Sequence, residues 1–102
     1  MYKVIYTSQF YVDIWYIKNH ITYVLNNPNS GQAIFNEIMD RTEALCDFPE
    51  RYSKLLINNL EYRRMPIKNF NVYYCVDKIS QTVTIARVLY SGIDINQVAI
   101  IN

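Results

Sequence analysis

Three arginines in the second half of the chain are its best candidates for chemistry. Arg63 and Arg64 are adjacent, and Arg87 follows on a later segment. Guanidinium groups bind phosphate or carboxylate through paired hydrogen bonds, so these side chains could anchor an acidic partner or a nucleic-acid backbone. They could instead be solvated, or paired with Glu61 or Asp77. Adjacent strand residues point to opposite faces, so only one of the arginine pair can face the open side of a sheet.

Alternating strands must position these arginines. Residues 62–68 predict a strand in which Pro66 favours an edge position or a bulge, whereas residues 54–60 are ambiguous between a strand and a turn. A turn at residues 78–81 joins the next two strands. Residues 70–77 alternate between an apolar face, with Phe70, Val72, Tyr74 and Val76, and a mixed face, with Asn71, Tyr73, Cys75 and Asp77.

The first half of the chain predicts a strand followed by a helix. Residues 3–7 form the strand, Ser8 caps the helix, and Pro28 ends it near Asn26. One face of this helix is apolar at steps of three and four residues, with Phe10, Ile14, Ile17, Ile21 and Val24.

A second helix follows after a short link, which makes the two helices an antiparallel hairpin. Asn29 or Ser30 caps it, and it runs to about Cys46. Residues 94–100 predict a short strand or one helical turn. The fold class is therefore α+β, with the order β-α-α-β-β-β. The hairpin covers one face of an antiparallel sheet and leaves the other partly open.

Composition limits the function. The 102 residues suit one domain, residues 1–102, and the net charge of +1 gives no strong field for nucleic acid or membranes. We expect no sequence-specific DNA binding by this chain alone and no membrane partner. Two cysteines and no apparent signal peptide indicate a reduced, cytoplasmic protein. The single histidine and scattered cysteines predict neither a metal site nor a cofactor.

Three segments in this order resemble the RelE/ParE superfamily of small bacterial toxins from type II toxin–antitoxin systems. They are YKVIYTSQFYVDIWYIKNHI, NNPNSGQAIFNEIMDRTEALCDFPE and EYRR…NFNVYYCVD…VTIARVLYSGID, and they span nearly the whole chain. The resemblance rests on their order and spacing, because no single motif is highly specific. It implies the superfamily fold, which agrees with the element order derived above.

The resemblance leaves two activities open. RelE-like members cut messenger RNA in the ribosome with a cluster of cationic residues and a tyrosine or histidine, whereas ParE-like members lack this cluster and poison DNA gyrase. Asn71 and Ser91 stand where the nucleases commonly carry arginines. Arg64, Arg87 and Tyr90 remain as the candidate catalytic set if the chain is a nuclease.

Physical chemistry favours the ParE-like interpretation. RNA cleavage needs a base, an acid and cations for the developing phosphorane charge, and neutral Asn71 and Ser91 supply no charge. We therefore expect a gyrase-binding toxin that is not an enzyme. The alternatives are a metal-independent, ribosome-dependent endoribonuclease, or a non-toxic member that only binds its antitoxin.

The resemblance also implies an antitoxin that wraps the hairpin and sheet in a hetero-oligomer. Aromatic residues dominate such contacts, which makes the first helix a candidate surface, although its aromatics could instead pack in the core. The candidate partner-binding residues are Tyr11, Trp15, Tyr16, Tyr23, Arg63, Arg64 and Arg87.

Overall fold

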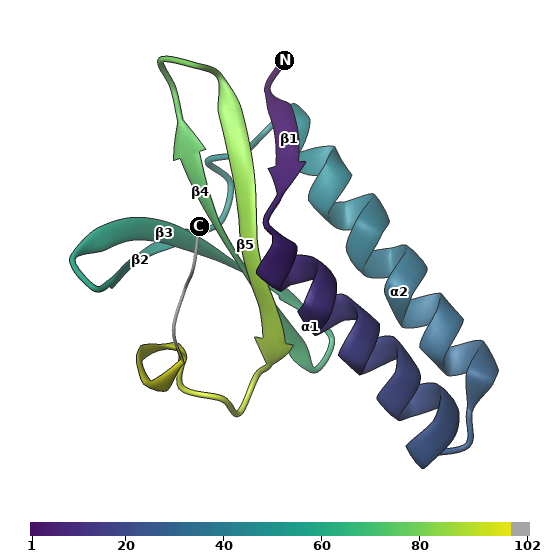
Figure 1. The fold of residues 1–102 in the computed structure, drawn as a ribbon. Helices are drawn as coiled ribbons and strands as arrows, with labels where there is room; N and C mark the ends of the chain where they lie inside the picture. Colours follow the sequence, from purple (N-terminus) through teal and green to yellow (C-terminus); the bar gives the residue numbers. More distant parts are fainter. Residues whose placement is uncertain (99–102) are drawn as a thin grey trace.

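A mixed sheet of five strands, in the order β1-β5-β4-β3-β2, forms the centre of the molecule, with the two helices beside it (Figure 1). The computed structural model describes residues 1–98. The chain runs through β1 (Lys3–Tyr6), α1 (Ser8–Asn19), a π-helical turn (His20–Val24), α2 (Pro28–Glu43), a 3-10 turn (Ala44–Cys46), β2 (Ser53–Ile57), β3 (Leu60–Ile67), β4 (Phe70–Asp77), β5 (Thr82–Tyr90) and a last 3-10 turn (Ile95–Gln97).

The expected α+β fold is confirmed, but the sheet has five strands instead of four and is mixed instead of purely antiparallel. The ambiguous segment is β2, which pairs antiparallel with β3, and β1 pairs parallel with β5 from Lys3 opposite Thr82. A parallel pair needs a long crossover connection, which the helical hairpin and three further strands provide. Pro66 lies in β3 beyond the end of β2, which pairs only as far as Arg64, so the proline occupies a local edge.

In both helices the capping residue lies one residue or more before the predicted one. Thr7, not Ser8, caps α1, and its hydroxyl accepts a hydrogen bond from Phe10 N at 3.0 Å. Asn27, not Asn29 or Ser30, caps α2 through Ser30 N at 3.2 Å. Pro28 fits the first turn of α2 because a first-turn amide has no acceptor within the helix.

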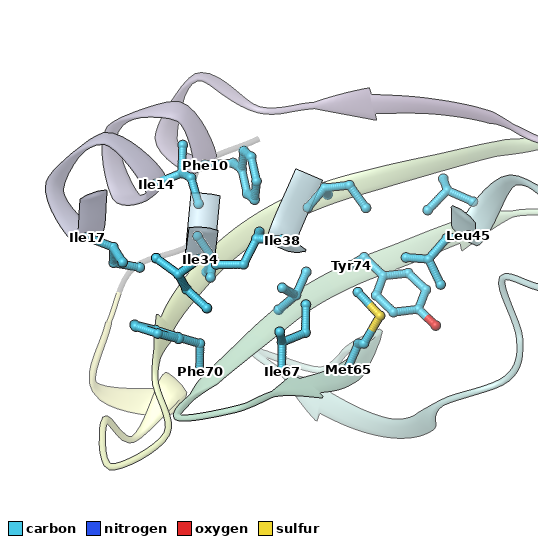
Figure 2. Packing of buried hydrophobic residues seen from close by; sticks show 14 residues of the cluster. Phe10, Ile14, Ile17, Ile34, Ile38, Leu45, Met65, Ile67, Phe70 and Tyr74 are labelled. Atoms are coloured by element: carbon cyan, nitrogen blue, oxygen red, sulfur yellow. The ribbon is translucent and has the colours of Figure 1, made fainter. Parts of the chain in front are cut away.

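The helical hairpin packs on one face of the sheet. Phe10, Ile14 and Ile17 of α1 and Ile34 and Ile38 of α2 are at most 6% exposed. Figure 2 shows them directed towards the sheet residues Met65, Ile67, Phe70 and Tyr74. Burying such side chains contributes about 1.5–3 kcal/mol each, so this layer holds the hairpin in place.

The opposite face is more covered than the sequence predicts. Tyr73, on the expected mixed face of β4, is 2% exposed, and Asn71 is 9% exposed. The last 3-10 turn lies on this side, away from the helices (Figure 1), and its Ile95 is 5% exposed. The buried members of this second cluster are Ile57, Tyr62, Tyr73, Ala86, Leu89 and Ile95. Of the segment predicted at residues 94–100, the last two residues lie outside the described part.

Candidate functional site

The outer side of α1 carries large aromatic side chains in contact with solvent. Trp15 is 68% exposed and Tyr23, in the π-helical turn, is 76% exposed. Tyr11 and Tyr16 are more than half exposed as well, although the Tyr11 ring also touches Tyr6 at a centroid distance of 5.7 Å. These four candidate binding residues therefore do not form the core between α1 and the sheet, which Phe10 and its neighbours provide.

Two apolar hollows lie along this surface. One, of about 300 Å³, is lined by Trp15, Tyr16, Asn19, His20, Tyr23 and Val24. The other, of about 260 Å³, lies between α1 and the end of β5. Tyr16 lines both hollows, and its ring stacks on His20 at 5.8 Å. Contiguous exposed apolar surface with aromatic side chains is typical of protein-binding sites.

The π-helical turn shapes the end of this surface. It widens the helix after Asn19, which moves Val24 from the predicted buried face to 67% exposure. Gly31 of α2 packs against the same region. A Cβ atom at Gly31 would lie 2.3 Å from Thr22 Oγ1 and 2.9 Å from the Lys18 carbonyl oxygen. The hairpin thus closes tightly only because this residue has no side chain.

The Arg87 side chain is buried in an ion pair inside the molecule. Its Nε and Nη2 atoms each donate to the carboxylate of Asp13 at 2.7 Å, and both residues are 8% exposed. Asp13 also accepts a hydrogen bond from Val88 N at 3.2 Å. The pairing predicted for Arg87 was with other acids, and Asp13 was missed. An acidic residue one turn after Phe10, on the apolar side of a predicted helix, was the available signal.

A β-bulge in β5 lies next to the residues that bind Asp13. Tyr73 pairs with Arg87 and Tyr74 with Ile85, so Ala86 is an extra residue in β5. Beyond the end of β1, the Ala86 carbonyl accepts a hydrogen bond from the Thr7 hydroxyl at 2.7 Å. Together with Asp13, this contact satisfies backbone groups of β5 that no strand pairs.

Arg63 is also committed to internal contacts. Its Nη1 donates to the carbonyls of Glu50 at 3.0 Å and Tyr52 at 2.7 Å, and the residue is 8% exposed. The neighbouring Tyr74 hydroxyl donates to Pro49 O at 2.6 Å. Burial raises the pKa of Tyr74 to about 12, while the charge of Arg63 acts in the opposite direction. These contacts hold the loop at residues 47–52 against the sheet.

The structure does not bring the three candidate nuclease residues together, because Arg64 lies apart from Arg87 and Tyr90. Arg64 lies opposite Tyr73 on the face away from the helices and is exposed. Tyr90 lies opposite Phe70, with the rings 4.6 Å apart, on the helix-covered face. Burial, and then the nearby Tyr16, raise the pKa of Tyr90, which makes it a weaker acid. Arg87 and Tyr90 line the hollow beside α1, but Arg64 does not.

No helix among residues 1–98 is long and apolar enough to cross a membrane.

No curated protein sequence matches the chain. A solved structure titled "Chromosomal ParDE TA system from P. aeruginosa" matches with a TM-score of 0.73 and 16% identity, covering 88% of this chain and 96% of that one. At this identity the match shows a common fold.

A family model described as "ParE toxin of type II toxin-antitoxin system, parDE" matches residues 4–95, from β1 to the start of the last 3-10 turn. The matched region includes both helices, all five strands and the exposed aromatic side of α1. The chain belongs to the ParE toxin family of type II toxin–antitoxin systems.

Proposed function

We propose that this toxin inhibits DNA gyrase by binding it, without catalysis, and that a cognate antitoxin neutralises it. The placement of Arg64 and Tyr90 on opposite faces of the sheet carries this proposal. An RNA-cleaving site needs its acid, base and cations within hydrogen-bond reach of one phosphate. Arg87, the third member of the candidate set, neutralises Asp13 instead.

The antitoxin docks on the exposed side of α1 in this proposal. Within α1 and the π-helical turn, the charged side chains are Asp13, which is buried, and Lys18, which is half-buried over the Phe35 ring. Most of the remaining exposed surface is apolar and aromatic, so it fits the apolar face of an amphipathic helix, which is a common occupant of such grooves. Arg63 and Arg87, both buried, take no part as anchors.

The decisive experiment compares two targets with one preparation of purified protein. We expect inhibition of gyrase supercoiling, and no cleavage of messenger RNA on translating ribosomes. In cells, expression should arrest growth with a DNA-damage response that a resistant gyrase abolishes. Co-expression with the antitoxin from the neighbouring reading frame should restore growth.

The opposite results identify the alternatives. Cuts at defined positions in translated messages, lost in both Arg64→Ala and Tyr90→Phe, would establish the nuclease. These two variants are informative because Arg64 is exposed and Tyr90→Phe keeps the ring contact with Phe70. Arg87→Ala is not, because it also leaves Asp13 unpaired in a buried site. The absence of any growth effect would indicate a member that only binds its antitoxin.

A further inference from the structure

The loop between α2 and β2, residues 47–52, carries a second exposed aromatic site. Phe48 is 73% exposed, although the next residue, Pro49, is buried. A hollow of about 610 Å³ lies beside the Phe48 side chain, which is about twice the volume of either hollow on α1. It is lined by Tyr2, Asp47, Phe48, Pro49, Glu50 and Arg51.

The backbone of this loop is fixed without any contribution from Phe48. Three of its carbonyl groups accept the hydrogen bonds from Arg63 and Tyr74 described above. The Glu50 side chain also pairs with Lys78 at 3.2 Å. Phe48 is therefore displayed on an ordered segment, which lowers the entropy cost of using its ring as a binding anchor.

Two arginines lie beside this ring. A smaller hollow, of about 90 Å³, shares Phe48 and Arg51 with the first and is also lined by Arg41 and Tyr52. Arg51 lies over the Tyr52 ring at 5.4 Å and makes no ion pair or hydrogen bond with any described residue. Arg41 donates to the Tyr52 hydroxyl at 3.2 Å, and its described acidic partner, Glu37, is 3.7 Å away. Two guanidinium groups around one small hollow are complementary to a carboxylate.

The chemistry of this region favours a protein as its occupant. We call Phe48, Arg41, Arg51 and the two hollows that they line the Phe48 surface. Its larger hollow is mainly apolar, and an exposed aromatic ring beside arginine is typical of the anchors of protein interfaces. A DNA backbone would instead require several cations, whereas Asp47 lines the larger hollow and the net charge of the chain is +1. The occupant that fits is a protein segment with an apolar side chain next to a carboxylate.

The Phe48 surface is remote from the hollow that contains Trp15 and Tyr23. That hollow lies towards the link between α1 and α2, whereas Phe48 follows the opposite end of α2 (Figure 1). The 16 residues of α2 span about 24 Å. The two surfaces can therefore bind different partners.

We propose that the Phe48 surface is the gyrase-binding site of this toxin and is separate from the antitoxin site on α1. A segment of gyrase would place an apolar side chain in the larger hollow and a carboxylate between Arg41 and Arg51. This inference rests on the proposed inhibition of gyrase and adds to it the surface that makes the contact.

The first test measures two activities of the full-length toxin, which are inhibition of supercoiling by purified gyrase and affinity for the antitoxin. Phe48→Ala should raise the toxin concentration that halves supercoiling at least tenfold and leave the antitoxin affinity unchanged, whereas Trp15→Ala should do the reverse. Leu56→Ala, at a residue 65% exposed on β2, is the matched control and should change neither activity. A folded Phe48→Ala variant that inhibits gyrase as well as the wild type, or that loses antitoxin affinity, overturns the proposal.

The second test examines the carboxylate contact. Arg51→Glu should weaken the inhibition of gyrase at least tenfold at low salt. Lys68→Glu is the control, because it changes the net charge by the same amount in the exposed β3–β4 turn and Lys68 lines neither hollow. Equal inhibition by these two variants contradicts the contact.

Two further outcomes are distinguishable from these. Binding of the toxin to linear DNA without gyrase, lost in Arg51→Glu, would mean that the arginines bind a phosphate, and it would overturn the protein contact. A wild-type toxin that does not inhibit gyrase contradicts the proposed function itself. Inhibition by the wild type that Phe48→Ala and Arg51→Glu both retain contradicts only the position of the gyrase site.

Discussion

Asp13 of α1 and Arg87 of β5 form a buried, two-pronged ion pair, with both nitrogen–oxygen distances at 2.7 Å. The pair joins the first helix to the last strand across 74 residues of sequence. Each residue is 8% exposed, so water stabilises neither charge much if the other is removed. The contact therefore fixes the position of the aromatic surface on α1 relative to the sheet.

Removal of one charge of this pair should destabilise the fold. We expect Asp13→Ala to lower the free energy of unfolding by about 3–5 kcal/mol, because it leaves Arg87 and Val88 N buried without this acceptor. Urea denaturation measures the change. Glu61→Ala is the control, because its pair with Lys54 is exposed at 3.6 Å and contributes about 0–1 kcal/mol. Similar losses of unfolding free energy in both variants would show that the buried pair contributes no more to stability than the exposed pair does.

The sequence predicted the packing of the helices on the sheet, because the spacing of apolar residues within one helix depends only on neighbouring residues. Phe10, Ile14 and Ile17 recur at helical spacing, and all three are buried as expected. Val24 was wrongly assigned to the same face. The π-helical turn changes the number of residues per turn after Asn19, so a period of 3.6 no longer predicts which side chains face the core.

Contacts between distant segments could not be predicted in the same way. The sequence gives Asp13 no marker of its partner, because Arg87 is brought to it by the strand order and by the bulge at Ala86. The covered second face was missed for a similar reason. Only the path of the chain after Tyr90 shows that Ile95 returns to the sheet.

Trp15 should affect binding far more than stability. It is 68% exposed, so Trp15→Ala should change the free energy of unfolding by no more than about 0.5 kcal/mol. Truncation of an aromatic anchor typically costs about 2 kcal/mol or more of binding, which corresponds to about 30-fold in antitoxin affinity. Calorimetric titration measures this. Phe48→Ala, at a residue 73% exposed in the loop at 47–52, is the control and should bind normally.

Tyr74 should make the fold sensitive to alkaline pH. Its pKa is about 12 in the folded chain, against an ordinary value of 10, because burial disfavours the phenolate. Between these values the unfolded chain has lost the proton that the folded chain keeps. Stability is therefore fully present below pH 10 and falls as the pH rises towards 12, by at most about 1.4 kcal/mol per pH unit from this group.

Unfolding measured in urea from pH 9 to 11.5 tests this expectation. Tyr74→Phe should reduce the alkaline slope, although it also lowers stability at pH 9 by removing the hydrogen bond to Pro49 O. Tyr23→Phe, at a residue 76% exposed, should leave the slope unchanged. If the wild type and Tyr74→Phe have equal slopes, burial of this hydroxyl is not the source of the pH dependence.

Gly31 should be required for the helical hairpin. Alanine at this position gains about 1 kcal/mol of helix propensity. That gain is exceeded by the clash, since the new Cβ would meet the Lys18 carbonyl at 2.9 Å, and this backbone atom cannot rotate away as a side chain could. We expect Gly31→Ala to destabilise the fold by about 1–3 kcal/mol in chemical denaturation.

Ser30→Ala, at the exposed preceding residue of α2, is the matched control and should change stability little. A Gly31→Ala variant as stable as the wild type would mean that α1 and α2 can separate by several tenths of an ångström at no cost. In that case the aromatic surface along α1 would not be held rigidly by the hairpin, and Gly31→Ala should also leave the antitoxin affinity unchanged.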